Sequence, residues 1–288
     1  MSSRARSPRA ESSRSPRAES RGDLGELSPL LEADLSRVEA VFTDVDGTLT
    51  TRGKLTSATL RAIEWLNAHH VKVVLVSGRP AGWGEAWVRQ WPVAGAIMEN
   101  GALHFAWRGA RLVKAYAQPA KQRARDRVAL QAHVQAALAH VKGARLSADS
   151  IYTEVDLAID YAEDVQLGPE AAGALEDFLG ERGVSAVRSS VHVNCWLGRF
   201  DKLSAVRRFA KLEWKKAVRP NERRFAYVGD SFNDAPMFGA FPLSIGVANV
   251  RDVLDQLDHK PRFVTRAREG KGFGEVADAI MRARRSSS

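Results

Sequence analysis

The sequence VFTDVDGTLT (residues 41–50) places two aspartates, Asp44 and Asp46, at the end of an apolar run and directly before Gly47. The apolar run predicts a buried strand, and buried charges are costly unless they are paired or bind a ligand. In parallel α/β sheets, ligands bind beyond the carboxyl ends of the strands. The two aspartates therefore mark a candidate ligand site, and similar polar residues should follow the neighbouring strands.

Short apolar runs alternate with helix-like segments from residue 37 onward. VEAVFTD and VKVVLVSGR flank the helix-like SATLRAIEWLNAHH, and the runs in RRFAYVGDS, FPLSIGVAN and PRFVT come later in the chain. Near-continuous apolar strands that alternate with helices are typical of a parallel sheet covered on both faces. The pattern predicts an α/β fold with a parallel sheet at its core.

The middle of the chain has a different pattern. A segment with helical spacing is followed by one that alternates like a half-exposed strand (151–164), a second helical segment and a short pair of strands. We therefore expect a small α+β domain with an open sheet, inserted into the α/β core. The expected ranges are 37–114 and 199–288 for the two parts of the core and 115–198 for the inserted domain.

Residues 1–36 are expected to form a disordered tail. RSPRAES occurs there twice, at 6–12 and 14–20, among few bulky apolar residues. Such a segment cannot bury enough surface to offset the entropy lost on ordering. Its six arginines are balanced by six acidic residues, so the excess behind the net charge of +9 lies elsewhere, around 199–224 and near the C-terminus.

Composition excludes several classes of protein. The 288 residues are 44% apolar and 27% charged, as in soluble globular proteins, and no run approaches the ~18 apolar residues of a membrane span. The single cysteine, Cys195, cannot form an internal disulfide, and no apolar segment follows the first arginines as it would in a secretory signal. We expect a cytoplasmic protein with no membrane partner.

Polar side chains also follow two later strands. The run VVLVSGR ends on Ser77, Gly78 and Arg79, and RRFAYVGDS ends on Asp230, with Asp234 four residues beyond it. Because the carboxyl ends of parallel strands meet at one edge of the sheet, these residues should lie near the two aspartates of the first strand. The sequence therefore predicts one crevice that gathers up to four carboxylates.

This crevice is expected to bind Mg²⁺. Carboxylates brought that close repel one another, and a divalent cation relieves the repulsion. Mg²⁺ prefers oxygen ligands and commonly binds through one or two carboxylates together with a substrate phosphate. Asp44 and Asp230 are the expected ligands, and the backbone carbonyl of Asp46 is expected to complete the protein's share.

The same residues can transfer a phosphoryl group. Asp44 beside Mg²⁺ stays ionised at pH 7 and can attack phosphorus as a nucleophile. Asp46 can protonate the leaving oxygen and later deprotonate the attacking water, which requires a pKa raised by about three units and therefore a closed, dry site. Ser77 can donate a hydrogen bond, and Lys202, after the inserted domain, a positive charge, to the phosphoryl oxygens.

Four segments resemble, in order, the motifs of the haloacid dehalogenase (HAD) superfamily: DVDGTLT, VVLVSGR, Lys202 and YVGDSFNDAPMF. The second aspartate of DVD resembles the phosphatase branch, and the inserted domain is similar to a type C2 cap. AIMENGALHF is similar to the Asn-Gly-Ala segment of the Cof-like subfamily IIB, a family with sucrose-phosphate and mannosyl-3-phosphoglycerate phosphatases and phosphomannomutases. The resemblance covers residues 40–280 and implies a HAD-like Rossmannoid core with a C2 cap.

The resemblance implies a role for each matched residue. Asp44 would be the nucleophile that forms an aspartyl-phosphate, and Asp46 the general acid/base. Ser77 and Lys202 would bind the phosphate. Asp230 would be a Mg²⁺ ligand, and Asp234 would support the metal. Further candidates for contacts with the substrate are Gly78, Arg79, Asn100 and Asn194. The expected activity is Mg²⁺-dependent hydrolysis of a small phosphate monoester, a sugar phosphate or a sugar-phosphoglycerate.

Two alternatives use the same sequence differently. A phosphomutase would employ Asp44 and Asp46 to pass phosphate between two hydroxyl groups. A non-catalytic protein would bind nucleic acid through the basic C-terminal region and the Arg-Ser tail, although the intact set of motifs argues against this second alternative.

Overall fold

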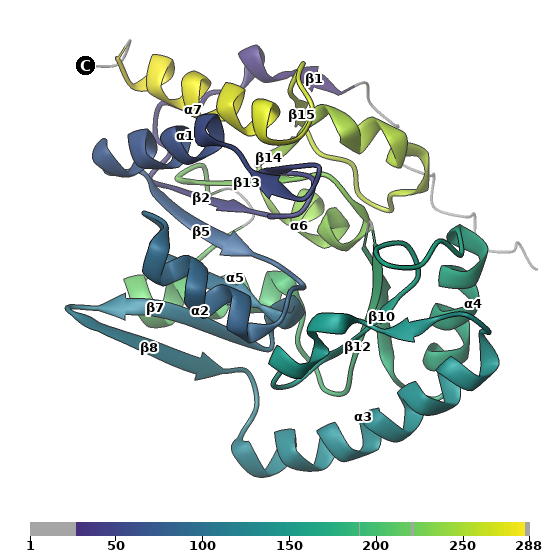
Figure 1. Ribbon diagram of the computed structural model, residues 1–288. Coiled ribbons are helices and arrows are strands. Elements are labelled where there is room, and N and C mark those ends of the chain that lie inside the picture. The colour runs from purple at the N-terminus through teal and green to yellow at the C-terminus, as the bar shows by residue number, and fades with distance from the viewer. Residues whose placement is uncertain (1–26, 190, 220–221, 286–288) are drawn as a thin grey trace, which may run out of the picture.

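A nine-stranded sheet forms the centre of the molecule. The computed structural model describes residues 27–189, 191–219 and 222–285 (Figure 1). The first seven strands across this sheet are parallel, and the last two form an antiparallel hairpin at one edge. Across the sheet the order is β1 (Ser28–Pro29), β15 (Phe263–Val264), β14 (Leu243–Gly246), β13 (Phe225–Gly229), β2 (Ala40–Thr43), β5 (Lys72–Val76), β6 (Gly95–Met98), β7 (Leu103–Arg108) and β8 (Arg111–Tyr116).

Helices cover both faces of this sheet. One face packs against α1 (Ser57–Ala68), α2 (Ala81–Gln90) and α7 (Glu269–Arg285), and the other against α5 (Lys202–Trp214) and α6 (Ala235–Ala240). Successive residues of a strand point to opposite faces, so Val41 of β2 packs with the first group and Phe42 with the second. The α/β core predicted from the alternating pattern is confirmed.

A second, smaller sheet lies between β8 and α5 in the chain. Its order is β11 (Ser185–Arg188), β12 (His192–Trp196), β10 (Leu157–Asp160) and β9 (Arg145–Leu146), all antiparallel. One face of this sheet packs against α3 (Ala120–His140) and α4 (Pro169–Gly180). We call residues 117–200 the cap; the inserted domain was expected at 115–198, but β8 keeps residues up to 116 in the core sheet. In Figure 1 the cap lies beside the carboxyl ends of the core strands.

The strand expected at 151–164 is shorter than the alternating pattern suggested. Only residues 157–160 form a strand, and all four are buried, because the face opposite the helices is covered as well. The register pairs Ala158 with Asn194 and Asp160 with His192, so these four residues share that opposite face. It is the face that His192 and Asn194 present to the core.

Short elements complete the fold. A hairpin of two-residue strands follows the first aspartates, and six 3₁₀ turns lie in the connections of the described chain. They are β3 (Thr50–Thr51), β4 (Lys54–Leu55), η1 (Leu30–Glu32), η2 (Glu99–Gly101), η3 (Ala148–Tyr152), η4 (Phe232–Asp234), η5 (Ala248–Asp252) and η6 (Leu254–Gln256). No helix among the described residues is long and apolar enough to cross a membrane.

The segment expected to be a disordered tail is ordered in its last part. Residues 1–26 lie outside the described residues, but β1 pairs in parallel with β15, and Leu30 and Leu35 are buried against the core. The expectation for residues 27–36 was therefore wrong. Composition averaged over the whole segment hid two leucines that bury enough apolar surface to fix this part of the chain.

Candidate active site

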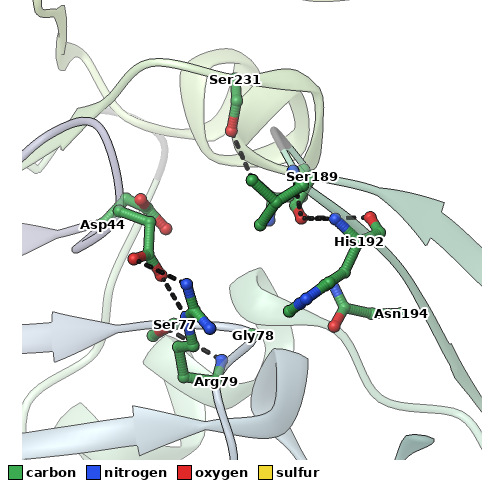
Figure 2. Close-up of a pocket in the computed structure, with 11 residues that line it drawn as sticks. Asp44, Ser77, Gly78, Arg79, Ser189, His192, Asn194 and Ser231 are labelled. Atoms are coloured by element: carbon green, nitrogen blue, oxygen red, sulfur yellow. Dashed lines mark hydrogen bonds and ion pairs between the residues drawn. The ribbon is translucent and has the colours of Figure 1, made fainter. Parts of the chain in front are cut away.

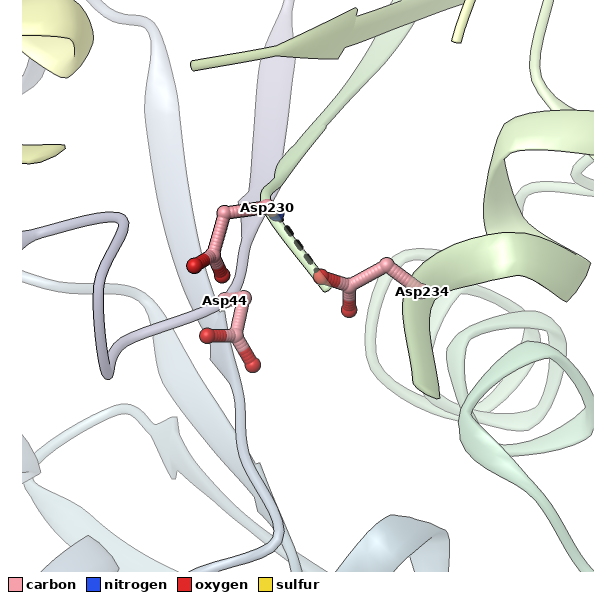
Figure 3. A group of neighbouring side chains, drawn as sticks. All are labelled: Asp44, Asp230 and Asp234. Carbon is pink, nitrogen blue, oxygen red and sulfur yellow. Dashed lines mark hydrogen bonds between the residues drawn. The ribbon is translucent and has the colours of Figure 1, made fainter. Parts of the chain in front are cut away.

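Three aspartates meet at the carboxyl ends of two neighbouring strands. Asp44 follows β2 and Asp230 follows β13, and the parallel pairing of these strands brings both residues to one edge of the sheet. Asp234 lies in η4, one turn beyond Asp230. All three are buried, and one carboxylate oxygen of each lies within 4.8 Å of the others (Figure 3). The structure thus brings together the three carboxylates that the sequence placed after the apolar runs VEAVFTD and RRFAYVGDS.

Lys202 lies among these carboxylates at the start of α5. Asp201 caps the helix by accepting a hydrogen bond from the backbone of Ser204, which fixes the position of the first helical turn. The Lys202 Nζ donates to Asp44 Oδ1 at 2.8 Å and to Asp234 Oδ1 at 2.7 Å. Burial by itself lowers the pKa of Lys202, but the charges of Asp234 and Asp44 outweigh it and raise the pKa. Lys202 is therefore a buried ammonium group.

Asp234 holds its neighbours in place through four hydrogen bonds. Besides Lys202, it accepts hydrogen bonds from the Tyr227 hydroxyl and from the backbone N–H groups of Asp230 (3.0 Å) and Ser231 (3.2 Å). Four donors use the acceptor positions of one carboxylate. Asp44 and Asp230 are therefore the residues with oxygens to offer a cation, and Asp234 holds Lys202 and the loop of Asp230 in place.

The crowded carboxylates are suited to a divalent cation. Burial, with the charges of Asp234 and Asp46 adding to it and Lys202 opposing it, raises the pKa of Asp44 to about 7. Burial and the charges of Asp44 and Asp234 raise the pKa of Asp230 well above its usual value. A hard cation with oxygen ligands stabilises the ionised forms and removes this conflict. The donor set therefore fits Mg²⁺.

Asp46 faces Arg79. Arg79 Nε lies 2.9 Å from Asp46 Oδ2, and its Nη2 lies 2.7 Å from Oε1 of Glu163 in the cap. Glu163 also lies 2.9 Å from Nε2 of His192, and these two partners lower the pKa of Glu163 to about 2. The Asp46 side chain keeps 32% of its surface exposed, so its environment is more open than the closed, dry site expected from sequence. Arg79 thus links the expected general acid to the cap.

A pocket lies between the core and the cap (Figure 2). It contains about 360 Å³ of space, including the part open to solvent. The residues that line the pocket are Asp44, Asp46, Ser77, Gly78, Arg79, Ser189, Val191, His192, Asn194, Ser231 and Asn233.

Gly78 lies close to two asparagines, of which only Asn194 lines the pocket. A Cβ atom on Gly78 would lie 3.1 Å from side-chain atoms of both Asn100 and Asn194, so the absence of a side chain permits their approach. Asn194 lines the pocket. Asn100 does not line it; it lies behind Gly78 and donates from Nδ2 to Asp156 Oδ2 at 3.2 Å. The expected contact of Asn100 with substrate stays a prediction.

Several residues of the site were missed in the sequence. Thr48 Oγ1 donates to Asp230 Oδ1 at 3.1 Å, and Asn249 Nδ2 donates to Asp230 Oδ2 at 2.8 Å. Thr48 lies within the opening motif, two residues after Asp46, and its position alone could have suggested a role. Glu163 and His192 carry no local signal, because only the folding of the cap brings them to Arg79.

Part of the chain matches a known protein family. Residues 41–155 match the family model of haloacid dehalogenase-like hydrolases. No curated protein matches the sequence.

Solved structures share the fold along most of the chain. A Thermoplasma acidophilum protein has a TM-score of 0.66 at 19% identity, covering 85% of this chain and 98% of its own. Sucrose-phosphatase from Synechocystis, solved with sucrose and phosphate, has a TM-score of 0.60 at 16% identity, with coverages of 85% and 98%. A sugar phosphatase of HAD subclass IIB has a TM-score of 0.56 at 16% identity, again covering 85% and 98%. Residues 41–155 are therefore similar to haloacid dehalogenase-like hydrolases, and the chain shares the fold of these solved structures along most of its length.

Proposed function

We propose that this protein is a Mg²⁺-dependent phosphatase that hydrolyses a small phosphate monoester through a phosphorylated Asp44. One observation carries the proposal. Asp44, Asp230 and Asp234 present oxygens within 4.8 Å of one another, and the buried Lys202 bridges two of them. A buried nucleophile beside a fixed positive charge is the arrangement that phosphoryl transfer requires.

Asp44 and Asp46 divide the chemistry between them. A carboxylate oxygen of Asp44 attacks phosphorus, and the bond from phosphorus to the ester oxygen breaks. Asp46, which pairs with Arg79 in this structure and takes up a proton from solvent as the substrate binds, gives that proton to the departing alkoxide. Asp46 then takes a proton from a water molecule whose oxygen attacks the phosphorus of the aspartyl-phosphate. The bond from phosphorus to Asp44 breaks, phosphate leaves, and both aspartates return to their starting states.

The residues around Asp44 are arranged to hold the transferred group. Asp44 and Asp230 would hold Mg²⁺, which when bound neutralises charge on the phosphoryl oxygens. Ser77 is buried at the end of β5, and its Oγ accepts from the backbone N–H of Arg79 at 3.0 Å, which leaves the hydroxyl proton free to donate. Lys202 supplies a fixed positive charge on the other side of Asp44.

The cap supports a sugar phosphate as the substrate. His192, Asn194 and Ser189 of the cap line the pocket opposite Asp44 and offer hydrogen-bonding groups. Such groups suit hydroxyl-rich molecules. Two of the proteins with the same fold are named as a sucrose-phosphatase and a sugar phosphatase, which agrees with this choice.

Phosphate release with and without Mg²⁺ tests the proposal. We expect a panel of sugar phosphates, phosphoglycerates, nucleotides and p-nitrophenyl phosphate to include a substrate whose kcat/KM falls at least about 10²-fold when EDTA removes the metal, because the carboxylates then repel the incoming phosphate. Restoring Mg²⁺ in excess of EDTA should restore the activity. EDTA-resistant release would contradict the metal requirement, and an isomerised product without free phosphate would indicate a mutase.

Replacing Arg79 by lysine tests the link from Asp46 to the cap. The lysine ammonium cannot reach Asp46 and Glu163 together as the planar guanidinium does, so we expect kcat/KM to fall by about 10- to 100-fold. Arg89→Lys, on the helix that follows Arg79, is a matched control, because Arg89 is exposed and pairs only with its helical neighbour Glu85 among described residues. Equal activity of the two variants would exclude a role for the bridge.

A further inference from the structure

The buried side chain of Glu99 joins three parts of the active-site region. Glu99 follows β6, and its carboxylate is fully buried. Oε1 accepts hydrogen bonds from the backbone N–H groups of Ala81 (2.9 Å) and Glu154 (2.8 Å), and Oε2 from those of Val155 (2.7 Å) and Asp156 (3.0 Å). Ala81 begins the helix after the loop of Ser77 to Arg79, and residues 154–156 lead into the cap strand β10. One carboxylate therefore fixes both the phosphate-site loop and the entry to the cap.

The backbone around Glu99 adopts a conformation that needs such support. Glu99 and Asn100 have φ values of +51° and +53°, and Gly101 follows at +103°. Positive φ is uncommon for residues with side chains and persists where the surroundings hold it. A Cβ atom on Gly101 would lie 2.4 Å from the carbonyl oxygen of Asp201, the N-cap residue of α5, the helix that begins with Lys202. The turn at 99–101 is thus wedged against the helix that carries Lys202.

The same turn reaches the phosphate-site loop and the cap by further contacts. The N–H of Glu99 donates to the Arg79 carbonyl at 3.2 Å, and the N–H of Asn100 donates to the Ser77 carbonyl at 3.2 Å. The Asn100 amide donates to Asp156 Oδ2, and a Cβ atom on Gly78 would lie 3.1 Å from the Asn100 side chain, which leaves little space between them. The position of Gly78 in the pocket therefore depends on where this turn is held.

We propose that Glu99 is a positioning residue of the active site, which holds the Asn100 turn beneath Gly78 and anchors cap residues 154–156 to the core. The catalytic effect of this arrangement rests on the proposed phosphatase function. No side chain of the turn contacts Asp44, and Lys202 is held by its bonds to Asp44 and Asp234, so loosening the turn should disturb the fit of the substrate between Gly78 and the cap more than the chemical step.

Glu99→Gln is the first test. A glutamine offers one acceptor oxygen, and its NH₂ group faces N–H donors, so at least two of the four hydrogen bonds are lost. We expect amide hydrogen exchange at residues 154–156 to become about tenfold faster or more. We also expect KM for the best sugar phosphate of the panel to rise about tenfold while kcat changes less than about threefold. Glu64→Gln, which removes an exposed carboxylate on α1, is the control.

A matched pair at Asp156 tests the inference even if Glu99→Gln does not fold. Asp156→Ala removes the acceptor of the Asn100 amide and should raise KM, whereas Asp156→Asn keeps an acceptor oxygen and should restore it to within about twofold of the unchanged protein.

Three results would overturn the role of Glu99. They are unchanged exchange at 154–156 in Glu99→Gln, a fall in kcat at constant KM with a lower melting temperature, and equal KM values for the two Asp156 variants. A purely structural role would produce the second result, because it would only reduce the fraction of folded enzyme. The exchange measurement needs no activity, so it also separates failure of this inference from failure of the phosphatase assignment.

Discussion

Asp44→Asn is expected to lower kcat/KM by at least about 10³-fold, because the amide cannot act as the nucleophile on phosphorus. The substitution keeps the size of the side chain, and one oxygen remains to accept the hydrogen bond from Lys202. The fold should therefore persist, with far-ultraviolet circular dichroism unchanged. The measurement is phosphate release under saturating Mg²⁺ with the best substrate of the panel.

The matched control for this variant is Asp278→Asn. Asp278 is exposed on α7, away from the site, so the same chemical change there should leave kcat/KM within about twofold. Activity of Asp44→Asn close to that of the control would refute Asp44 as the nucleophile. Loss of activity together with loss of the circular dichroism signal would instead trace the effect to unfolding.

Lys202→Met is expected to have the largest effect on stability. Lys202 is 3% exposed and neutralises two buried carboxylates, those of Asp44 and Asp234. Removing one partner of a buried ion pair costs about 3–5 kcal/mol, because the remaining charge stays buried without compensation. We expect a decrease of that size in the free energy of unfolding, measured by urea denaturation in EDTA, and a loss of activity of at least about 10²-fold.

Lys211→Met on the same helix provides the comparison. Lys211 lies on the exposed face of the helix, so its replacement should change the free energy of unfolding by less than about 0.5 kcal/mol. If the two variants were equally stable, the buried bridge from Lys202 to Asp44 and Asp234 would not describe the protein in solution. Mg²⁺ should partly restore the stability of Lys202→Met, since a cation can compensate the same carboxylates.

The sequence by itself determined the fold class and the core of the candidate site. Alternating apolar runs and helices required a covered parallel sheet, and parallel strands bring their carboxyl ends to one edge. Asp44 and Asp230 were therefore expected to meet if their strands are neighbours, and the pairing of β2 with β13 makes them neighbours. This much is local information combined with one rule of topology.

Only the tertiary structure decided how the side chains are shared among partners. In the structure, Asp234 accepts hydrogen bonds from Lys202 and from backbone N–H groups, and Asp46 pairs with Arg79, which also contacts the cap. Asn100 lies beside Gly78. Such partners lie far apart in the chain, and a hydrogen bond between them depends on ångström-scale distances that no local pattern records. For the same reason Glu99 carried no sign in the sequence that its carboxylate would bind four backbone N–H groups from two domains.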